Sequence, residues 1–508
     1  MKNKILTILI LITFTNIIFS QKINNSNFKY PEITKEQMYS DFDEFVKILE
    51  NCAVQLPVKK QVTGFDNLTE IKNLRKNIDT VSNTKYFYYI LYDAIRLMKD
   101  YNTSVVDCYL PEYEKYSDID IEYIKQYSDY IKTKTIEPEN IEQLKNSYFP
   151  VPAYYFDGNY YFGGEQDLVN KNNNKDTLKI SIMKLISFNG NSPDYLQEQK
   201  QELGEWDFLR KRFYCNALWL PTKGILNVEQ DGKMFSINLE DYVYDKWGLS
   251  IATTTVKLDG IPEDKDRNSF VEFFDKDSIL FICIIGAVEN SDFITKIKKV
   301  GKNKKIKKVI IDVRNGGSDL AWQNVLKAII KDPLSYKIDL AYNDTEIMQK
   351  KFKEYEKISK PETINWLNNQ KVRIINEENK YIVPDKNSLK YSGNIYILIN
   401  YFNTSLVAFC SYQDKLVSVG TVSTRLSGFD KKTTLFQLKH SKFTFRLSTT
   451  MDITNCTKPE DIYHAFPEVV VNPSFEDGFL YKYSIYDTKS EEYLRKYDKI
   501  FKKVLELK

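Results

Sequence analysis

The chain has 508 residues, 42% of them hydrophobic and 28% charged, a composition that can bury a sizeable core in roughly two to four domains. Its 72 lysines and arginines nearly balance 69 aspartates and glutamates, and a net charge of +3 gives no reason to expect a nucleic-acid partner. With two histidines and six scattered cysteines, a histidine-rich metal centre is excluded and neither a metal nor another cofactor is expected.

Residues 1–20 are expected to be a signal peptide. Lys2 and Lys4 precede an apolar or hydroxyl run from Ile5 to Phe19, and Ser20-Gln21 offers a small residue for cleavage. A membrane anchor is the competing interpretation, but this run is short against the roughly 20 residues that span a bilayer. We therefore expect an exported protein, periplasmic or extracellular, with no stable membrane insertion after cleavage. Such a compartment is oxidising, so one or two disulfides remain possible among the six cysteines.

Residues 21–147 are predicted to form a helical domain. Apolar residues recur at helical spacing in two stripes, and further helical stretches lie near Ile119–Lys132 and Pro138–Asn146. The stripes consist of Met38, Phe42, Phe45, Val46 and Leu49, and of Phe87, Ile90, Leu91, Ala94, Ile95 and Met98. The second stripe ends in a polar corner, Asp100 to Val105.

Residues 148–250 are predicted to form a small β-rich module. Short aromatic and β-branched runs are broken here by glycine and asparagine. The expected elements are a hairpin from Ala153 to Gly163, a strand from Leu178 to Phe188 with a turn at Asn189-Gly190, and a hairpin from Ile225 to Leu239 turning at Asp231-Gly232. The pattern leaves open whether this module carries a site or only packs.

Residues 251–480 alternate between strands and helices, which favours an α/β layer with parallel strands. The predicted strands are Ile279–Ile285, Lys308–Val313, Ile395–Asn400 and Leu416–Gly420, and the predicted helices are Asn290–Val300, Ser318–Lys331 and Ser405–Gln413. The charged insertion Asn343–Asn369 is expected to be an exposed helical excursion. Within residues 481–508, Glu492–Leu507 is predicted to be a last amphipathic helix.

A glycine turn follows the second of these strands. Arg314, Asn315, Gly316 and Gly317 come directly after the apolar run Val309–Val313. Because no Cβ keeps a ligand away, backbone N–H groups at adjacent glycines can contact an anion. The turn is therefore a candidate oxyanion site, or else a strand-to-helix corner that contains glycine for geometric reasons.

A serine opens the helix after the third predicted strand. Ser405 lies at a helix N-terminus, where unpaired N–H groups and the helix dipole favour developing negative charge. It is a candidate nucleophile, with the N–H of Leu406 and the Gly316-Gly317 turn as oxyanion donors. The alternative is an ordinary Thr/Ser helix cap.

Six motifs occur in the same order as in one known peptidase family. Each stretch of this chain resembles one feature of the family. Asp100–Val105 resembles an Asp-Gly-His-Thr corner, Met183–Gly190 the end of a PDZ-like module, and Ile311–Gly317 the signature Asp-x-Arg-Gly-Asn-Gly-Gly. Asn403–Ala408 resembles the nucleophile turn, Gly420–Thr424 the motif Gly-Glu-x-Thr, and Phe436–Ser441 the motif Phe-x-Leu-Pro-Asn-Ser. The chain thereby resembles the tail-specific, or C-terminal-processing, serine peptidases and their tricorn-like and retinoid-binding-protein-like relatives. The resemblance implies an α/β fold with a crotonase-like (ClpP-like) core, an N-terminal helical domain and a small PDZ-like module. It also implies an exported bacterial protein that hydrolyses a peptide or protein substrate.

The chain departs from this family at the general base. Family members activate the serine with a later lysine or with the histidine of the corner. Asn102 stands at the histidine position, and an amide is not a base near neutral pH. Lys431 and Lys432 lie downstream of Ser405 and can serve as the base only if desolvation lowers their pKa; otherwise they are exposed loop lysines.

Other departures weaken the site further. His440, on a predicted strand, and His464, in a late loop, are not obvious substitutes for the missing base. The glycine signature is one residue shorter than in the family, and Thr421 stands where a glutamate is usual.

Two functional hypotheses follow. The chain is an exported serine peptidase with Ser405 as nucleophile, or it is a catalytically degenerate relative that binds peptides or another protein. A carbohydrate-binding protein, suggested by 14% aromatic residues, is disfavoured because those residues are spread along the chain. The oligomeric state is not predicted.

Overall fold

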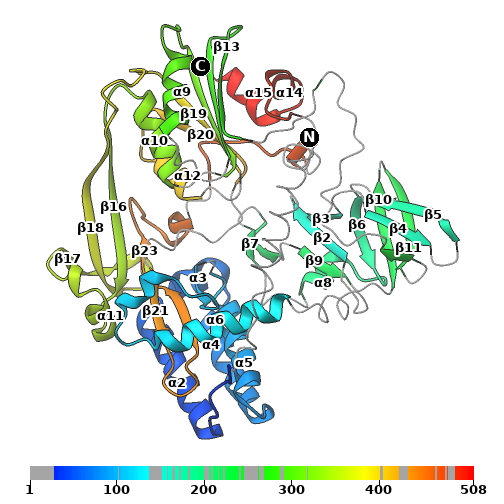
Figure 1. Cartoon of the computed structure of the whole chain (residues 1–508), viewed down its shortest axis with the longest axis vertical. Coiled ribbons are helices and arrows are strands. Elements are labelled where there is room, and N and C mark those ends of the chain that lie inside the picture. The colour runs from blue at the N-terminus through cyan, green and yellow to red at the C-terminus, as the bar shows by residue number, and fades with distance from the viewer. Residues whose placement is uncertain are drawn as a thin grey trace, which may run out of the picture.

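Figure 1 shows the computed structural model of the whole chain. It describes residues 28–100, 102–136, 151–156, 158–162, 166–170, 173–180, 183–198, 205–207, 210–214, 217–220, 224–230, 232–239, 242–244, 261, 268–285, 291–316, 319–400, 404–422, 433–463, 466–474, 477–478 and 487–507. The expected signal peptide and the predicted helix Pro138–Asn146 lie outside these residues. Within them, no helix has the length and apolar character needed to cross a membrane.

The N-terminal part is helical, as predicted. Its helices are α2 (Lys35–Cys52), α3 (Leu56–Thr63), α4 (Asn67–Asn73), α5 (Thr84–Leu97) and α6 (Ile121–Ile136), with 3₁₀ turns at Leu74–Thr80 and Pro111–Lys115. Thr34 and Gln37 form a reciprocal capping box that starts α2. The two predicted stripes are confirmed: every member is buried except Val46, which is half-buried. Burial of these stripes holds α2 and α5 together.

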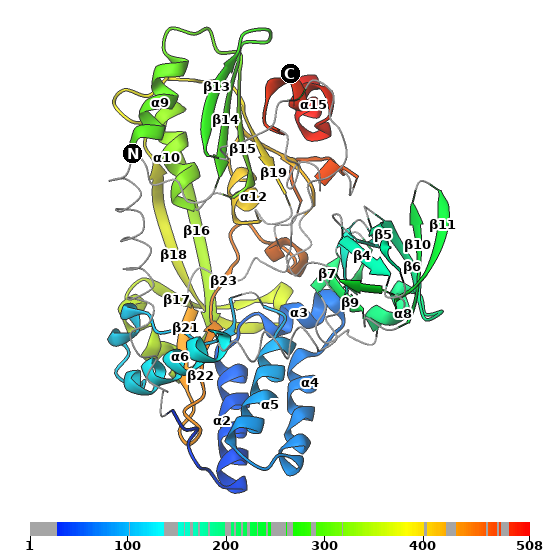
Figure 2. The same ribbon diagram turned by 45° about the vertical axis from the view of Figure 1, so that its right-hand side comes forward.

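The helices share their core with strands that come much later in the chain. Two antiparallel sheets lie against them, in the orders β1–β22–β21 and β17–β18–β16–β23. Their strands are β1 (Ser104–Val105), β21 (Thr433–Gln437), β22 (Thr444–Ser448), β16 (Leu334–Asn343), β17 (Ser359–Ile364), β18 (Gln370–Ile382) and β23 (Met451–Asp452). Asp41 of α2 accepts the N–H groups of His440 and Ser441 at 3.1 and 2.6 Å, so helices and sheet form one packed unit (Figure 2).

The middle of the chain is β-rich, as predicted. A six-stranded sheet has the order β11–β10–β6–β3–β2–β9, beside a sheet β12–β4–β5 and the pair β7–β8. The strands are β2 (Val151–Phe156), β3 (Asn159–Phe162), β4 (Gln166–Asn170), β5 (Asn173–Ile180), β6 (Met183–Phe188), β7 (Glu205–Asp207), β8 (Arg212–Tyr214), β9 (Ala217–Leu220), β10 (Ile225–Gln230), β11 (Lys233–Asn238) and β12 (Tyr242–Tyr244), with helix α8 (Pro193–Glu198) after β6.

Both predicted hairpins in this region are confirmed, because β2 pairs with β3 and β10 pairs with β11 in antiparallel register. The predicted single strand Leu178–Phe188 is wrong. It consists of two strands, since β5 pairs with β4 whereas β6 pairs with β3 and β10. The chain therefore changes sheets between Ile180 and Met183.

The α/β layer is a six-stranded sheet in the order β13–β14–β15–β19–β20–β24. Its strands are β13 (Phe270–Phe274), β14 (Ile279–Ile285), β15 (Lys308–Asn315), β19 (Ile395–Ile399), β20 (Leu416–Gly420) and β24 (Val469–Val470). Only the β13–β14 pair is antiparallel among these strands. The predicted parallel layer is confirmed.

Helices cover both faces of this sheet (Figures 1 and 2). One face packs against α9 (Ser291–Gly301), α10 (Asp319–Ile329) and α12 (Thr404–Cys410), all three close to their predicted ranges. The other face packs against α14 (Glu491–Lys496) and α15 (Lys499–Glu506). Burial on two sides explains why the central strands read as continuous apolar runs.

Two predictions about helices are wrong. The insertion Asn343–Asn369 is not an exposed helical excursion, because short α11 (Glu346–Lys351) is followed by β17, and Met348 and Phe352 are buried against the N-terminal helices. The predicted last helix is two helices. It breaks before Asp498, whose carboxylate caps α15 by accepting the N–H of Phe501 at 2.9 Å.

Candidate active site

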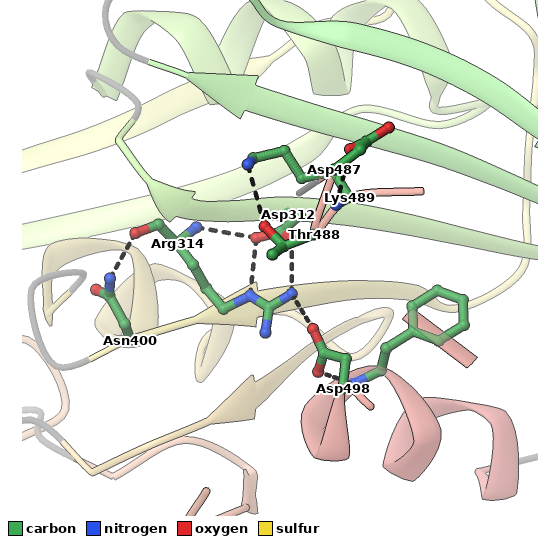
Figure 3. Close-up of polar contacts among 8 residues, drawn as sticks. Asp312, Arg314, Asn400, Asp487, Thr488, Lys489 and Asp498 are labelled. Carbon is green, nitrogen blue, oxygen red and sulfur yellow. Dashed lines mark hydrogen bonds and ion pairs between the residues drawn. The ribbon is translucent and has the colours of Figure 1, made fainter. Parts of the chain in front are cut away.

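The glycine turn and the serine helix start from neighbouring strand ends. β15 and β19 run parallel with Ile311 opposite Ile397 and Asp312 opposite Leu398, so both strands end at the same edge of the sheet. Directly after β19, the side-chain amide of Asn400 donates to the carbonyl oxygen of Arg314 (Figure 3). The turn after β15 and the segment that leads into α12 therefore begin side by side.

Gly316 adopts a backbone conformation that favours glycine. Its φ is +130°, where an L-residue with a Cβ is strained. Its N–H donates to the carbonyl oxygen of Val313 at 3.2 Å, so in this conformation that donor is engaged inside its own turn. Gly317 lies outside the described residues.

Ser405 and Leu406 lie in the first turn of α12, as predicted. The first N–H groups of a helix have no partner within it, which makes this turn a local source of donors. The side chains of Leu406 and Val407 are buried in the cluster between the sheet and α10, which anchors the helix start. Lys431, Lys432 and His464 lie outside the described residues.

Asp100 organises the corner that contains Asn102. The Oδ1 of Asp100 accepts the Asn102 N–H at 3.1 Å, and its Oδ2 accepts from Thr103 Oγ1 at 2.9 Å and from Gln55 Nε2 at 3.1 Å. The Thr103 hydroxyl in turn accepts the N–H of Ser448 at 3.1 Å. The corner is thus fixed to α3 on one side and to the end of β22 on the other.

A buried lysine supports the same corner and was not foreseen. Lys59 of α3 is 1% exposed and donates from Nζ to the carbonyl oxygens of Met98 and Lys99, at 2.6 and 3.3 Å. Burial lowers the pKa of Lys59 to about 8, while the Asp100 carboxylate opposes the shift. The only sequence signal was a lysine placed one turn after Gln55 in an otherwise apolar helix start.

A hollow lies beside the corner. It has a volume of about 360 Å³, and Tyr92, Arg96, Asp100 and Val105 are among the residues that line it. This falls within the range of small-ligand sites, roughly 300–1,000 Å³. The corner is therefore reachable from solvent on the side of α5 and β1.

The predicted residues are brought together only in part. Gly316 and α12 lie at one sheet edge, whereas Asn102 follows α5 and precedes β1 of another sheet. Among described residues, no hydrogen bond joins Asn102 to Gly316; its carbonyl oxygen accepts from Arg446 Nε at 3.3 Å. His440 was predicted on a strand, but it lies in the turn between β21 and β22, because Asp41 accepts its backbone N–H there.

Sequence reasoning also missed a buried ionic cluster at the end of β15. Asp312 and Arg314 lie two residues apart on a strand, so both side chains project from the same face, the one covered by α14 and α15. Charged residues at alternate positions of an otherwise apolar strand were a readable signal, because buried charges require partners.

No protein-family model matches the chain, and no curated protein sequence matches it. Mature CPAF is a similar solved structure, with 14% identity, 93% of this chain and 98% of that chain covered, and a TM-score of 0.49. The photosystem II D1 C-terminal processing protease has 10% identity, coverage of 87% and 94%, and a TM-score of 0.32. A putative S41 protease from Bacteroides fragilis has 11% identity, coverage of 73% and 90%, and a TM-score of 0.29.

Proposed function

We propose that the chain is an exported serine-type peptidase of the tail-specific kind, with a crotonase-like core and a PDZ-like module, which hydrolyses peptide bonds with Ser405 as the nucleophile. The observation that carries the proposal is the parallel register of β15 and β19, which starts the Gly316 turn and the Ser405 helix from adjacent strand ends. A nucleophile and a set of backbone donors at one sheet edge are two of the parts that acyl transfer requires, and a general base is the third.

Each residue has a defined role in this mechanism. The Ser405 hydroxyl attacks the peptide carbonyl carbon and gives its proton to Lys431 or Lys432, which later protonates the leaving amine. The N–H groups of Leu406, Gly316 and Gly317 hold the oxyanion, and loss of one such donor typically lowers the rate by about 10²–10³. Since the Gly316 N–H is bonded to the Val313 carbonyl, it must turn away from that oxygen to take part.

A catalytically degenerate peptide-binding protein is the second candidate. Three observations favour it: Asn102 occupies the family's histidine position, the Gly316 N–H is engaged, and a hollow opens beside the Asp100 corner. In that case the fold retains a peptide-binding site while the serine lacks a base.

Labelling with a fluorophosphonate probe distinguishes the two candidates. The purified protein is compared with Ser405→Ala and with the matched control Ser411→Ala, which removes an exposed serine directly after the same helix. A peptidase is expected to give one covalent adduct, mapped to Ser405, that is lost in Ser405→Ala and kept in Ser411→Ala. No Ser405-dependent adduct from about pH 6 to about pH 10, the range in which a histidine or lysine base titrates, overturns the peptidase proposal.

The base is identified by single substitutions. If Lys431 or Lys432 accepts the proton, only the corresponding alanine variant loses labelling, and the native rate rises with pH through the pKa of that lysine. Equal labelling in Lys431→Ala, Lys432→Ala and the native protein removes both lysines from the mechanism.

A further inference from the structure

The guanidinium of Arg314 is buried between two carboxylates from distant parts of the chain. It donates from Nε to Asp312 Oδ1 at 3.0 Å and from one terminal nitrogen to Asp312 Oδ2 at 2.7 Å. The same terminal nitrogen lies 2.7 Å from Asp498 Oδ2. Figure 3 shows the Arg314 side chain in contact with both carboxylates. The Arg314 and Asp498 side chains are 6% and 4% exposed and that of Asp312 is fully buried, so these ion pairs are screened much less than exposed ones.

Each carboxylate oxygen of Asp498 accepts a hydrogen bond from a different partner. Its Oδ1 caps α15 through the N–H of Phe501, while its Oδ2 binds Arg314. Removing one partner of a buried ion pair leaves an uncompensated charge, which is strongly destabilising. The position of Arg314 therefore depends in part on α15, which Asp498 caps and which covers one face of the sheet.

The backbone of Arg314 connects this cluster to the candidate site. Its N–H donates to Asp312 Oδ1 at 3.0 Å, and its carbonyl oxygen accepts from the side chain of Asn400. Gly316 follows two residues later, and α12 begins at Thr404, four residues after Asn400. The two segments that form the candidate site are thus attached to one residue, and Asp312 and Asp498 together hold that residue.

We infer that Asp498 is a positioning residue for the site: through Arg314 it fixes the end of β15, and through the contact of Arg314 with Asn400 it fixes the end of β19, from which the chain leads to α12. This inference rests on the proposed function, since it assigns to Asp498 the alignment of the oxyanion donors with Ser405. Small misplacements of a reacting group lower rates steeply, by up to about 10² for 1 Å.

The test uses Asp498→Asn with Lys499→Gln as the matched control. The asparagine keeps an oxygen that can cap α15 but removes the charge that binds Arg314. Lys499 is the next residue along; it pairs with Asp477 at 2.7 Å, half of its side chain is exposed, and Lys499→Gln breaks an ion pair at the same helix end. Saturation kinetics with a fluorophosphonate separate the covalent step from probe binding.

Asp498→Asn is expected to slow the covalent step about 10-fold or more while the concentration for half-saturation stays unchanged. Lys499→Gln is expected to react at the native rate. Asp498→Glu, which retains the carboxylate, is expected to recover at least part of the rate. Equal rates in native protein and folded Asp498→Asn overturn the inference, as does a loss of equal size in Lys499→Gln.

Hydrogen exchange tests the link without any need for activity. In Ser405→Ala, adding Asp498→Asn is expected to speed amide exchange at residues 309–316 and 404–410 about 10-fold, whereas exchange in α5 is unchanged. If exchange speeds up in this way but the native protein is not labelled by the fluorophosphonate, the structural link from Asp498 to the two segments is supported and the peptidase proposal is rejected. Labelling of the native protein with unchanged exchange keeps the peptidase and rejects the link. If Asp498→Asn fails to fold, Asp498→Ser, whose hydroxyl can cap α15 but carries no charge to bind Arg314, is compared with Lys499→Gln instead: faster exchange at both segments only in Asp498→Ser supports the link, and its absence rejects it.

Discussion

The Nζ of Lys59 lies 2.6 Å from the carbonyl oxygen of Met98, so a buried lysine closes the C-terminal end of α5 just before the Asp100 corner. Amine donors at this end of a helix satisfy carbonyl groups that have no partner within the helix. A neutral amine still has two hydrogens to donate, so the contact survives loss of the charge. Because Lys59 is buried, its charged form is disfavoured in the folded chain, and the free energy of unfolding therefore depends on pH.

The first prediction concerns this link. The pKa of Lys59 is lowered from 10.5 to about 8 on folding, so between these values the unfolded chain binds more protons than the folded one. The contribution of Lys59 to the free energy of unfolding is then fully present above about pH 10.5. It falls as the pH decreases through about 8, by a total of about 3 kcal/mol.

Urea unfolding of native protein and Lys59→Met at several pH values measures this contribution as a difference. The difference is expected to grow with pH from about 8 to about 10.5. Lys60→Met is the control, since its side chain is 59% exposed. A difference for Lys59→Met that does not change with pH contradicts the prediction.

The second prediction concerns the hydroxyl of Thr103. It donates to Asp100 and accepts from the N–H of Ser448, and the residue is 4% exposed. Thr103→Val keeps the shape but leaves the buried N–H of Ser448 without its acceptor and removes one of the donors to Asp100, so we expect a loss of about 1–3 kcal/mol in the free energy of unfolding. Thr103→Ser, which retains the hydroxyl, is expected to lose less than half as much in the same urea titration.

The third prediction concerns Gly420 at the end of β20. A Cβ at this position, where φ is +157°, would lie 2.1 Å from the backbone carbonyl oxygen of Ile399. Backbone of a buried strand cannot move aside, so Gly420→Ala is expected to lose about 3 kcal/mol or more of stability. In Gly301→Ala the three atoms nearest to the added Cβ all belong to the side chain of Leu389, which can rotate. Equal thermal unfolding temperatures for the two variants would contradict this reasoning.

The fourth prediction concerns Asn102. If the corner faces the Ser405 turn, Asn102→His supplies a base, and fluorophosphonate labelling is expected to increase above a pKa of about 6.5, where the imidazole is neutral. Asn102→Gln, which cannot accept a proton, is the control. A folded Asn102→His protein that labels no faster than Asn102→Gln shows that the corner lies away from the nucleophile.

The strands of the α/β layer could be predicted because each forms a continuous apolar run. Ile279–Ile285 and Leu416–Gly420 have the boundaries expected from the sequence, since both faces of these strands are buried. β16 and β18 were missed because they mix charged and apolar residues and bury only part of their length. A two-residue strand such as β1 has too few residues for any periodicity.

The candidate site was predicted only where its residues are close in sequence. The Gly316 turn and the Ser405 helix are local patterns, and the parallel strands that bring them together follow from the alternation of strands and helices. The contact between Arg314 and Asp498 joins residues 184 positions apart, and the local sequence around either residue does not predict the other as its partner. Lys59 and Met98 present the same difficulty. Long-range polar partners depend on how the elements pack, which a single sequence does not specify.

The position of α14 and α15 has a consequence for the order in which the chain folds. Leu494, Ile500, Phe501 and Val504 cover one face of the sheet, and all of them follow every strand of that sheet in the chain. As the chain is synthesised, the apolar face formed by Phe281, Ile310 and Leu398 has no cover until residues 491–506 have emerged. The sheet is therefore completed late, and until then its uncovered face is a surface to which a chaperone can bind.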